Sequence, residues 1–317
     1  MKKVIPILKE RAIYVALIAL FIIFSCLSSD FLSPNNLINI ARQIAVLGIA
    51  SVGMTYVILI GGIDLSTGSI ITFVNIIAAY LMVNMGINMW LAILIALLSS
   101  TAIGFLNGLL VANMNIPSLI VTFASQTIFE GFAYIISKGM PIFGFPKGFA
   151  TIGQGYVGFI PIPVIVMVVI FLIGGFILNK TYFGRYFYAL GGNETAAQMA
   201  GIRVKRVKYL IFSLSGLFAG IAGIIMLART NSGQPTAGKG YEFQVITAVA
   251  LGGVSLSGGS GKLSNVVAGV LIMGILKNGM VLLNISEYVQ MVVEGIILLL
   301  AVGFDCLQKR KLGYQNH

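Results

Sequence analysis

Charge is the scarcest ingredient of this sequence. Of 317 residues, 20 are basic and only 9 acidic, so 9% are charged, against roughly a quarter in soluble domains. So few charges cannot cover the surface of a soluble globule, and 58% hydrophobic residues exclude a disordered chain. A nucleic-acid-binding protein and an ordinary soluble enzyme are excluded as well. The remaining class is an all-α polytopic membrane protein.

Cysteine and histidine are nearly absent too. Cys26 and Cys306 lie at opposite ends of the chain, so neither a metal cluster nor a disulfide has support. His317, the only histidine, is the last residue, which excludes histidine-based catalysis and most zinc sites. We therefore expect no catalytic residue, no metal and no cofactor, and a protein that is not an enzyme.

Long uncharged runs are what the sequence has instead. A helix needs about 20 apolar residues to cross a bilayer, which allows about ten spans in one domain covering residues 1–317. The first is interpreted as a retained helix rather than a signal peptide, and 138–160 as a Gly/Pro-rich loop. The eighth span, at 244–258, is expected to be a broken or half helix. The predicted spans are 12–29, 43–63, 68–84, 90–111, 118–137, 162–178, 210–228, 244–258, 263–283 and 288–304.

Basic residues gather in three short segments. These are the N-terminus with Lys2, Lys3, Lys9 and Arg11, the loop 179–209, and a tail with Lys309, Arg310 and Lys311. Ten spans that start inside place all three segments on one side, as the positive-inside rule requires. The sequence therefore predicts a multi-pass protein of the cell membrane with a cytoplasmic loop 179–209 and both termini cytoplasmic.

Asp64 is the most informative acid, because uncharged runs of 21 and 65 residues flank it. A carboxylate at mid-membrane costs about 2.5–3.5 kcal/mol, so such a residue would need a partner, water or a function. Alternatively, Asp64 caps the next helix at a break near the membrane surface. In either case the backbone groups freed by the break must face protein or water.

Three other charged residues fall inside predicted spans. Glu294 and Lys277 lie in the last two, where they either form a pair or extend toward the membrane surface. Glu130 lies within the fifth span or faces a cavity.

Glycine-containing motifs mark several segments. The stretch 61–69 (GGIDLSTGS) matches 252–260 (GGVSLSGGS) at six of nine positions, which indicates either a repeat on one side of the membrane or chance. The motifs Gly104–Gly108 and Gly216–Gly220 (GxxxG) favour close helix packing within the chain. The stretches 153–158 and 233–239 mimic nucleotide-binding motifs but lack the surrounding strand and helix, so the chain has no ATP site of its own.

The loop 179–209 contains a short predicted helix over 194–200. Asn193 is placed to cap it and Gly201 to end it. This element is either part of a solvated basic loop or a docking element for a soluble partner.

At these residues the chain resembles the permease subunits of sugar ATP-binding-cassette importers, the ribose/xylose/galactose group, and ribose permeases above all. The resemblance covers nearly the whole chain. It implies a central path in a membrane dimer, whose second permease subunit is the same chain or a homologue. It also implies an ATP-binding subunit (two copies or a fused tandem) that hydrolyses the ATP, and an extracytoplasmic sugar-binding protein. The motifs that carry the resemblance are 61–66 (GGIDLS), 184–201 with 189–194 (ALGGNE), 234–238 (QPTAG) and 251–259 (LGGVSLSGG).

The resemblance maps ATPase coupling onto the loop 179–209, at Gly184, Asn193, Glu194, Ala197 and Gly201. We expect inward transport of a small, ribose-like monosaccharide. The alternatives are an ion-coupled secondary transporter of a small polar solute, using Asp64, Glu130 and Glu294, and an intramembrane enzyme, which the scattering of the acids disfavours. The candidate residues of the substrate path are Asp64, Asn75, Asn107, Gln126, Asn278 and Glu294.

Overall fold

The fold is a bundle of long helices, as the sequence predicts. A computed structural model describes the backbone of residues 4–313 and the side chains of residues 13–307. In that part of the chain eight helices are long and apolar enough to cross a membrane. They are α2 (Pro34–Leu59), α3 (Ser66–Val83), α4 (Met89–Asn113), α5 (Ser118–Ser137), α7 (Ile162–Lys180), α10 (Val204–Thr230), α12 (Leu263–Leu282) and α13 (Glu287–Gly313).

Two further helices bring the membrane elements to the expected ten. Helix α1 (Val4–Leu27) precedes the bundle, and α11 (Tyr241–Leu251) is a half-helix of 11 residues. At 1.5 Å per residue α11 covers about 16 Å, half of the hydrocarbon core. The prediction of a span to residue 258 is therefore wrong in its second half. A loop with glycines at positive φ, Gly253, Gly258, Gly259 and Gly261, follows from residue 252.

The region 138–160, predicted as a plain loop, contains small elements. Helix α6 (Phe149–Gln154) is followed by the two-residue antiparallel strands β1 (Tyr156–Val157) and β2 (Ile160–Pro161). Gly153 of α6 lies against the C-terminal end of α10, where an added Cβ would be 2.1 Å from the backbone nitrogen of Arg229. This glycine is therefore needed for packing as well as for the loop.

Glycine lets α4 and α10 cross closely at the centre of the bundle. A Cβ on Gly104 would lie 2.1 Å from the carbonyl oxygen of Phe212, and a Cβ on Gly216 would lie 2.3 Å from that of Ser100. The GxxxG prediction of packing within one chain is confirmed for this pair of helices. Helix α13, by contrast, has only 6% of its apolar window buried, so it lies at the edge of the bundle.

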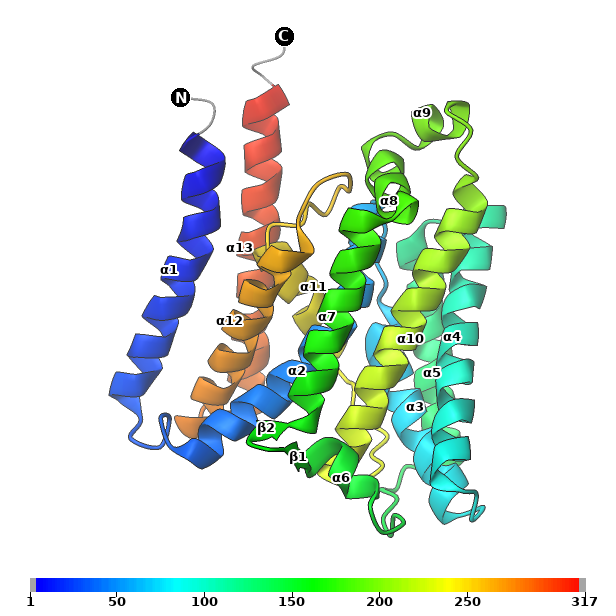
Figure 1. The fold of residues 1–317 in the computed structure, drawn as a ribbon, viewed down its shortest axis with the longest axis vertical. Coiled ribbons are helices and arrows are strands. Elements are labelled where there is room, and N and C mark those ends of the chain that lie inside the picture. Colours follow the sequence, from blue (N-terminus) through cyan, green and yellow to red (C-terminus); the bar gives the residue numbers. More distant parts are fainter. Residues whose placement is uncertain (1–3, 314–317) are drawn as a thin grey trace.

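The ends of the molecule are unequal. The start of α1 and the end of α13 lie at the same end as the short helices α8 (Tyr182–Gly192) and α9 (Glu194–Met199) (Figure 1). The hairpin β1–β2 and α6 lie at the opposite end. This arrangement agrees with three basic segments on one side. The basic side chains on which the predictions for the two termini depend lie outside the described residues, as does His317. They are Lys2, Lys3, Lys9, Arg11, Lys309, Arg310 and Lys311.

Candidate functional site

The chain is broken between α2 and α3, where residues 61–65 leave the helical path. Side chains of α5 take up the freed backbone groups. The Oγ of Ser118 accepts from the N–H of Ile63 at 3.1 Å, and the Oγ1 of Thr122 accepts from the N–H of Leu65 at 3.0 Å. Thr122 also donates to the carbonyl of Ile63 at 3.2 Å. The predicted requirement that these groups face protein or water is met by protein.

Asp64 is fully buried at this break. Its Oδ1 accepts from the N–H and the hydroxyl of Ser66, at 3.0 and 2.5 Å, which caps the first residue of α3. Its Oδ2 accepts from the hydroxyl of Ser215 on α10 at 2.7 Å. Asn107 of α4 extends the group by donating to the Ser66 hydroxyl at 3.0 Å. Asp64 thus joins the break to α10 from the position before Leu65, the N-cap residue of α3, which makes no side-chain capping bond of its own. The role of Asp64 in a substrate path stays a prediction.

Two glycine pairs, Gly191 with Gly259 and Gly258 with Gly61, meet beside this break. A Cβ on Gly191 of α8 would lie 1.8 Å from the carbonyl oxygen of Leu59 and 2.4 Å from the nitrogen of Gly259. Gly259 donates its N–H to Leu59 at 2.9 Å, and Gly258 touches the backbone of Gly61. The two similar stretches 61–69 and 252–260 therefore lie at one end of the molecule, in mutual contact.

The two stretches do not start their helices at matching positions. Helix α3 begins within the first stretch, at Ser66, whereas α12 begins after the second, at Leu263. The two stretches lie on the same side of the molecule, as a repeat would require, but the different helix starts give no further support to a structural repeat.

A second break precedes α11. Residues 232–240 run along α3, where Asn75 Oδ1 accepts from the N–H of Gln234 and Thr72 Oγ1 accepts from that of Gly238, both at 2.9 Å. Gly68 completes this face, because a Cβ there would be 2.6 Å from the carbonyl oxygen of Gly238. Asn75 is fully buried and serves this backbone contact.

Glu242 is a functional candidate that the sequence analysis missed. It lies at the start of α11, is 3% exposed, and its Oε1 accepts from Gln126 Nε2 at 3.1 Å. Its Oε2 is buried without a hydrogen-bond partner. The signal in the sequence is an acid directly before the uncharged run 243–261. Gln126, a predicted residue of the substrate path, therefore binds the Glu242 carboxylate. Glu130 lies within helix α5, which is one of the two positions that the sequence left open for it.

Glu294 and Lys277 face each other between α13 and α12. Lys277 Nζ lies 4.0 Å from Glu294 Oε1, and Gln244 Nε2 donates to Glu294 Oε2 at 3.2 Å. Of the two alternatives that the sequence left open, the structure shows the pair. Asn278 lies apart from it, in a reciprocal pair of hydrogen bonds with Asn36 at 2.9 and 3.0 Å. That pair joins α12 to α2, which gives Asn278 a structural contact.

The predicted short helix is present as α9. Asn193 caps it by accepting from the N–H of Ala196 at 2.9 Å, and Gly201 follows it at φ +83. Ala197 is the one buried residue of α9, so the rest of the helix is free to meet a partner. Glu194 accepts from Lys208 of α10 at 2.7 Å and keeps half of its side chain exposed.

Helix α8 links this element to the bundle. Gly184 fits against the end of α7, where a Cβ would lie 2.0 Å from the carbonyl oxygen of Leu178. Tyr188 donates its hydroxyl to the carbonyl of Gly261 at 2.8 Å. Burial raises the pKa of Tyr188 above its ordinary value, with Lys262 opposing the shift, so the hydroxyl stays protonated and able to donate.

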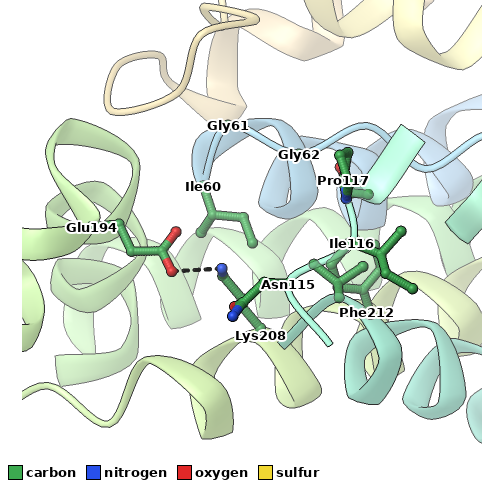
Figure 2. A pocket seen from close by; sticks show the side chains of 11 residues that line it. Ile60, Gly61, Gly62, Asn115, Ile116, Pro117, Glu194, Lys208 and Phe212 are labelled. Carbon is green, nitrogen blue, oxygen red and sulfur yellow. Dashed lines mark hydrogen bonds and ion pairs between the residues drawn. The ribbon is translucent and has the colours of Figure 1, made fainter. Parts of the chain in front are cut away.

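Glu194 and Lys208 border a cavity of about 300 Å³ (Figure 2). The turn with Gly61 and Gly62 forms another wall, and the α4–α5 turn with Ile116 and Pro117 closes it. The helix break, α9 and α10 therefore meet at one place on the surface.

The described part of the chain contains no cluster of metal-ligating side chains. No three His, Cys, Asp or Glu residues there lie close enough to hold an ion, and Cys26 and Cys306 are free and exposed. The acids are spread over separate contacts, as the sequence indicated.

A bundle of membrane-spanning helices with two interrupted spans and an exposed short helix at one end is typical of a membrane transport protein. The chain belongs to the family described as "Branched-chain amino acid transport system / permease component", which it matches over residues 36–302. No solved structure matches it.

Characterised relatives are similar over almost their whole length. The ribose import permease of Bacillus subtilis (strain 168) is 44% identical, covering 94% of this chain and 93% of the relative. That of Escherichia coli (strain K12) is 42% identical, covering 94% of both. The L-arabinose transport system permease of the same strain is 41% identical, covering 93% and 90%.

Proposed function

We propose that this chain is the transmembrane subunit of an ATP-binding-cassette importer that moves a ribose-like monosaccharide into the cytoplasm. Similarity above 40% to permeases named for ribose and arabinose, over more than nine-tenths of the chain, is the observation that carries the proposal. The family description names branched-chain amino acids, so leucine is the competing substrate to test.

Energy enters through separate subunits in this proposal. Two ATP-binding subunits, or a fused tandem, dock on the end that carries α8 and α9, which faces the cytoplasm. The exposed surface of α9 supports this, because only Ala197 of that helix is buried. An extracytoplasmic sugar-binding protein delivers the substrate at the opposite end.

A second permease subunit, the same chain or a homologue, completes the path. The exposed face of α13 supports this assignment. Its apolar residues include Met291, Val292 and Leu299, each at least 60% exposed. Exposure of such an apolar face to water is unfavourable, whereas contact with a second permease subunit or with membrane lipid is not.

The movement follows from the contacts at the α9 end. Nucleotide binding draws the ATPases together and shifts α9. Residues 200–203, which join α9 to α10 and are tied back to α9 by the bond from the N–H of Ile202 to the carbonyl of Ala197, pass that shift to α10. Ser215 of α10 holds Asp64 at the helix break. The break is the part of the bundle that can rearrange, because its backbone bonds run to side chains rather than to a helical ladder.

Substrate class is tested with the complete complex. The permease, its ATP-binding subunit and its binding protein are purified from native membranes and reconstituted, and uptake of labelled D-ribose is measured with unlabelled competitors. We expect ribose to compete fully, arabinose partly and leucine not at all. Competition by leucine alone would overturn the sugar assignment.

A further inference from the structure

A polar cavity of about 670 Å³ lies beside the half-helix α11. It is bounded by the segment 236–240, α11, α12 and α13, and its polar lining includes Lys239, Gln244, Lys277, Glu287, Gln290 and Glu294. Helix α12 begins near α8, where Tyr188 meets Gly261, and Lys277 is its fifteenth residue. At 1.5 Å per residue this places Lys277 about 21 Å from that end, near the side opposite α9.

The Lys277–Glu294 pair forms the charged wall of this cavity. Its atoms are 4.0 Å apart, longer than the 2.7–2.9 Å of a charge-assisted hydrogen bond. The surface pair Glu194–Lys208, at 2.7 Å, shows such a bond in the same molecule. The side chains of Lys277 and Glu294 remain 29% and 14% exposed, so both reach the cavity.

Neighbouring groups hold the two side chains in place without using all their capacity. Gln244 donates to one oxygen of Glu294, and Lys277 Nζ lies 5.6 Å from the centre of the Tyr241 ring. An ammonium has three donors and a carboxylate has several acceptor positions. The facing donor and acceptor therefore remain open toward the cavity.

Placing a lysine and a glutamate inside a membrane span is costly, and such residues mark functional sites by default. Lys277 also lines a second cavity of about 220 Å³, together with Gln43, Arg229 and Gln234. Lys277 thus lies between two cavities that both have polar linings. A residue whose role was packing alone would not need to face both.

We propose that Lys277 and Glu294 form a diol-binding subsite for a neutral sugar at the outward end of the path. One hydroxyl accepts from Lys277 while its neighbour donates to Glu294, and Gln244 orients the carboxylate. The pair has no net charge, so it binds an uncharged polyol without trapping ions. Weak binding suits a path, because the substrate must also leave. This inference rests on the proposed transport of a sugar.

Direct binding tests the subsite without any ATPase. The full-length permease in lipid nanodiscs is studied by saturation-transfer NMR with D-ribose and with 2-deoxy-D-ribose, which lacks the 2-hydroxyl and therefore both vicinal diols that include it. We expect a signal for ribose that falls about fivefold or more in Glu294→Gln and in Lys277→Gln, and a weak signal for the deoxy sugar throughout. Asp30→Asn, which removes an exposed acid that does not line the cavity, should keep the full signal.

Transport separates the possible failures. In the reconstituted complex we expect Glu294→Gln and Lys277→Gln to lower ribose uptake, whereas Asp30→Asn should leave it at the wild-type level. If the wild-type complex moves ribose and both variants match it in binding and uptake, the subsite is wrong although the transport function stands. If the wild type neither binds nor moves ribose, the transport proposal itself fails. Exchange of the two residues in K277E/E294K checks folding, because it keeps the pair.

Discussion

Replacement of Asp64 by alanine is expected to lower the melting temperature of the purified permease by about 4–5 °C. The change removes three hydrogen bonds to a buried carboxylate and leaves the Ser66 N–H and the Ser215 hydroxyl with no acceptor. Hydrogen bonds contribute about 0.5–1.5 kcal/mol each, and a buried donor left without an acceptor adds to the cost, so we expect a loss of about 3 kcal/mol. Thermal unfolding in detergent, followed by the loss of helical circular dichroism, measures the shift.

Two milder variants show which bonds matter. Asp64→Asn keeps an acceptor for Ser66 and offers the Ser215 hydroxyl a donor, so we expect a small shift. Ser215→Ala removes only the bond to α10 and should fall between the two. A melting temperature for Asp64→Ala within about 2 °C of the wild type would contradict the role assigned to this carboxylate.

Glu194→Ala is expected to lower ATP-driven uptake about tenfold while membrane insertion and melting temperature stay unchanged. A tenfold effect corresponds to about 1.4 kcal/mol, the scale of one well-placed interfacial contact. Stability should not move, because a half-exposed ion pair contributes about 0–1 kcal/mol. Uptake and sugar-stimulated ATP hydrolysis are measured in the same vesicles.

Lys208→Ala is the matched control for this variant. It breaks the same ion pair but leaves the Glu194 carboxylate on the exposed face of α9. We expect Lys208→Ala to keep more than half of the wild-type uptake if Glu194 contacts the ATPase directly. Normal uptake by Glu194→Ala would overturn the docking assignment.

The sequence predicts the elements whose signals are local. Runs of apolar residues give the spans, and Asn193 and Gly201 mark the ends of α9 within one or two residues. The half-helix could be predicted in kind but not in extent, because apolar residues continue past Leu251 while the glycines at positive φ end the helix.

Contacts between distant segments could not be predicted. Nothing near Asp64 in the sequence indicates that Ser215 will bind it, and the partners of the break on α5 lie more than 50 residues away. Asn278, a predicted residue of the substrate path, pairs with Asn36 from α2, a partner 242 residues away that the sequence gives no means of identifying. A polar residue type gives the need for a partner but not the partner's identity.

The source of energy tests the central proposal most directly. Vesicles with the permease and a sugar-loaded binding protein are compared with and without the ATP-binding subunit, and with and without imposed proton or sodium gradients. We predict that ribose accumulates only when the ATP-binding subunit and ATP are present, whatever the gradient. Accumulation driven by an ion gradient in vesicles that lack the ATPase would contradict the proposal and favour an ion-coupled transporter.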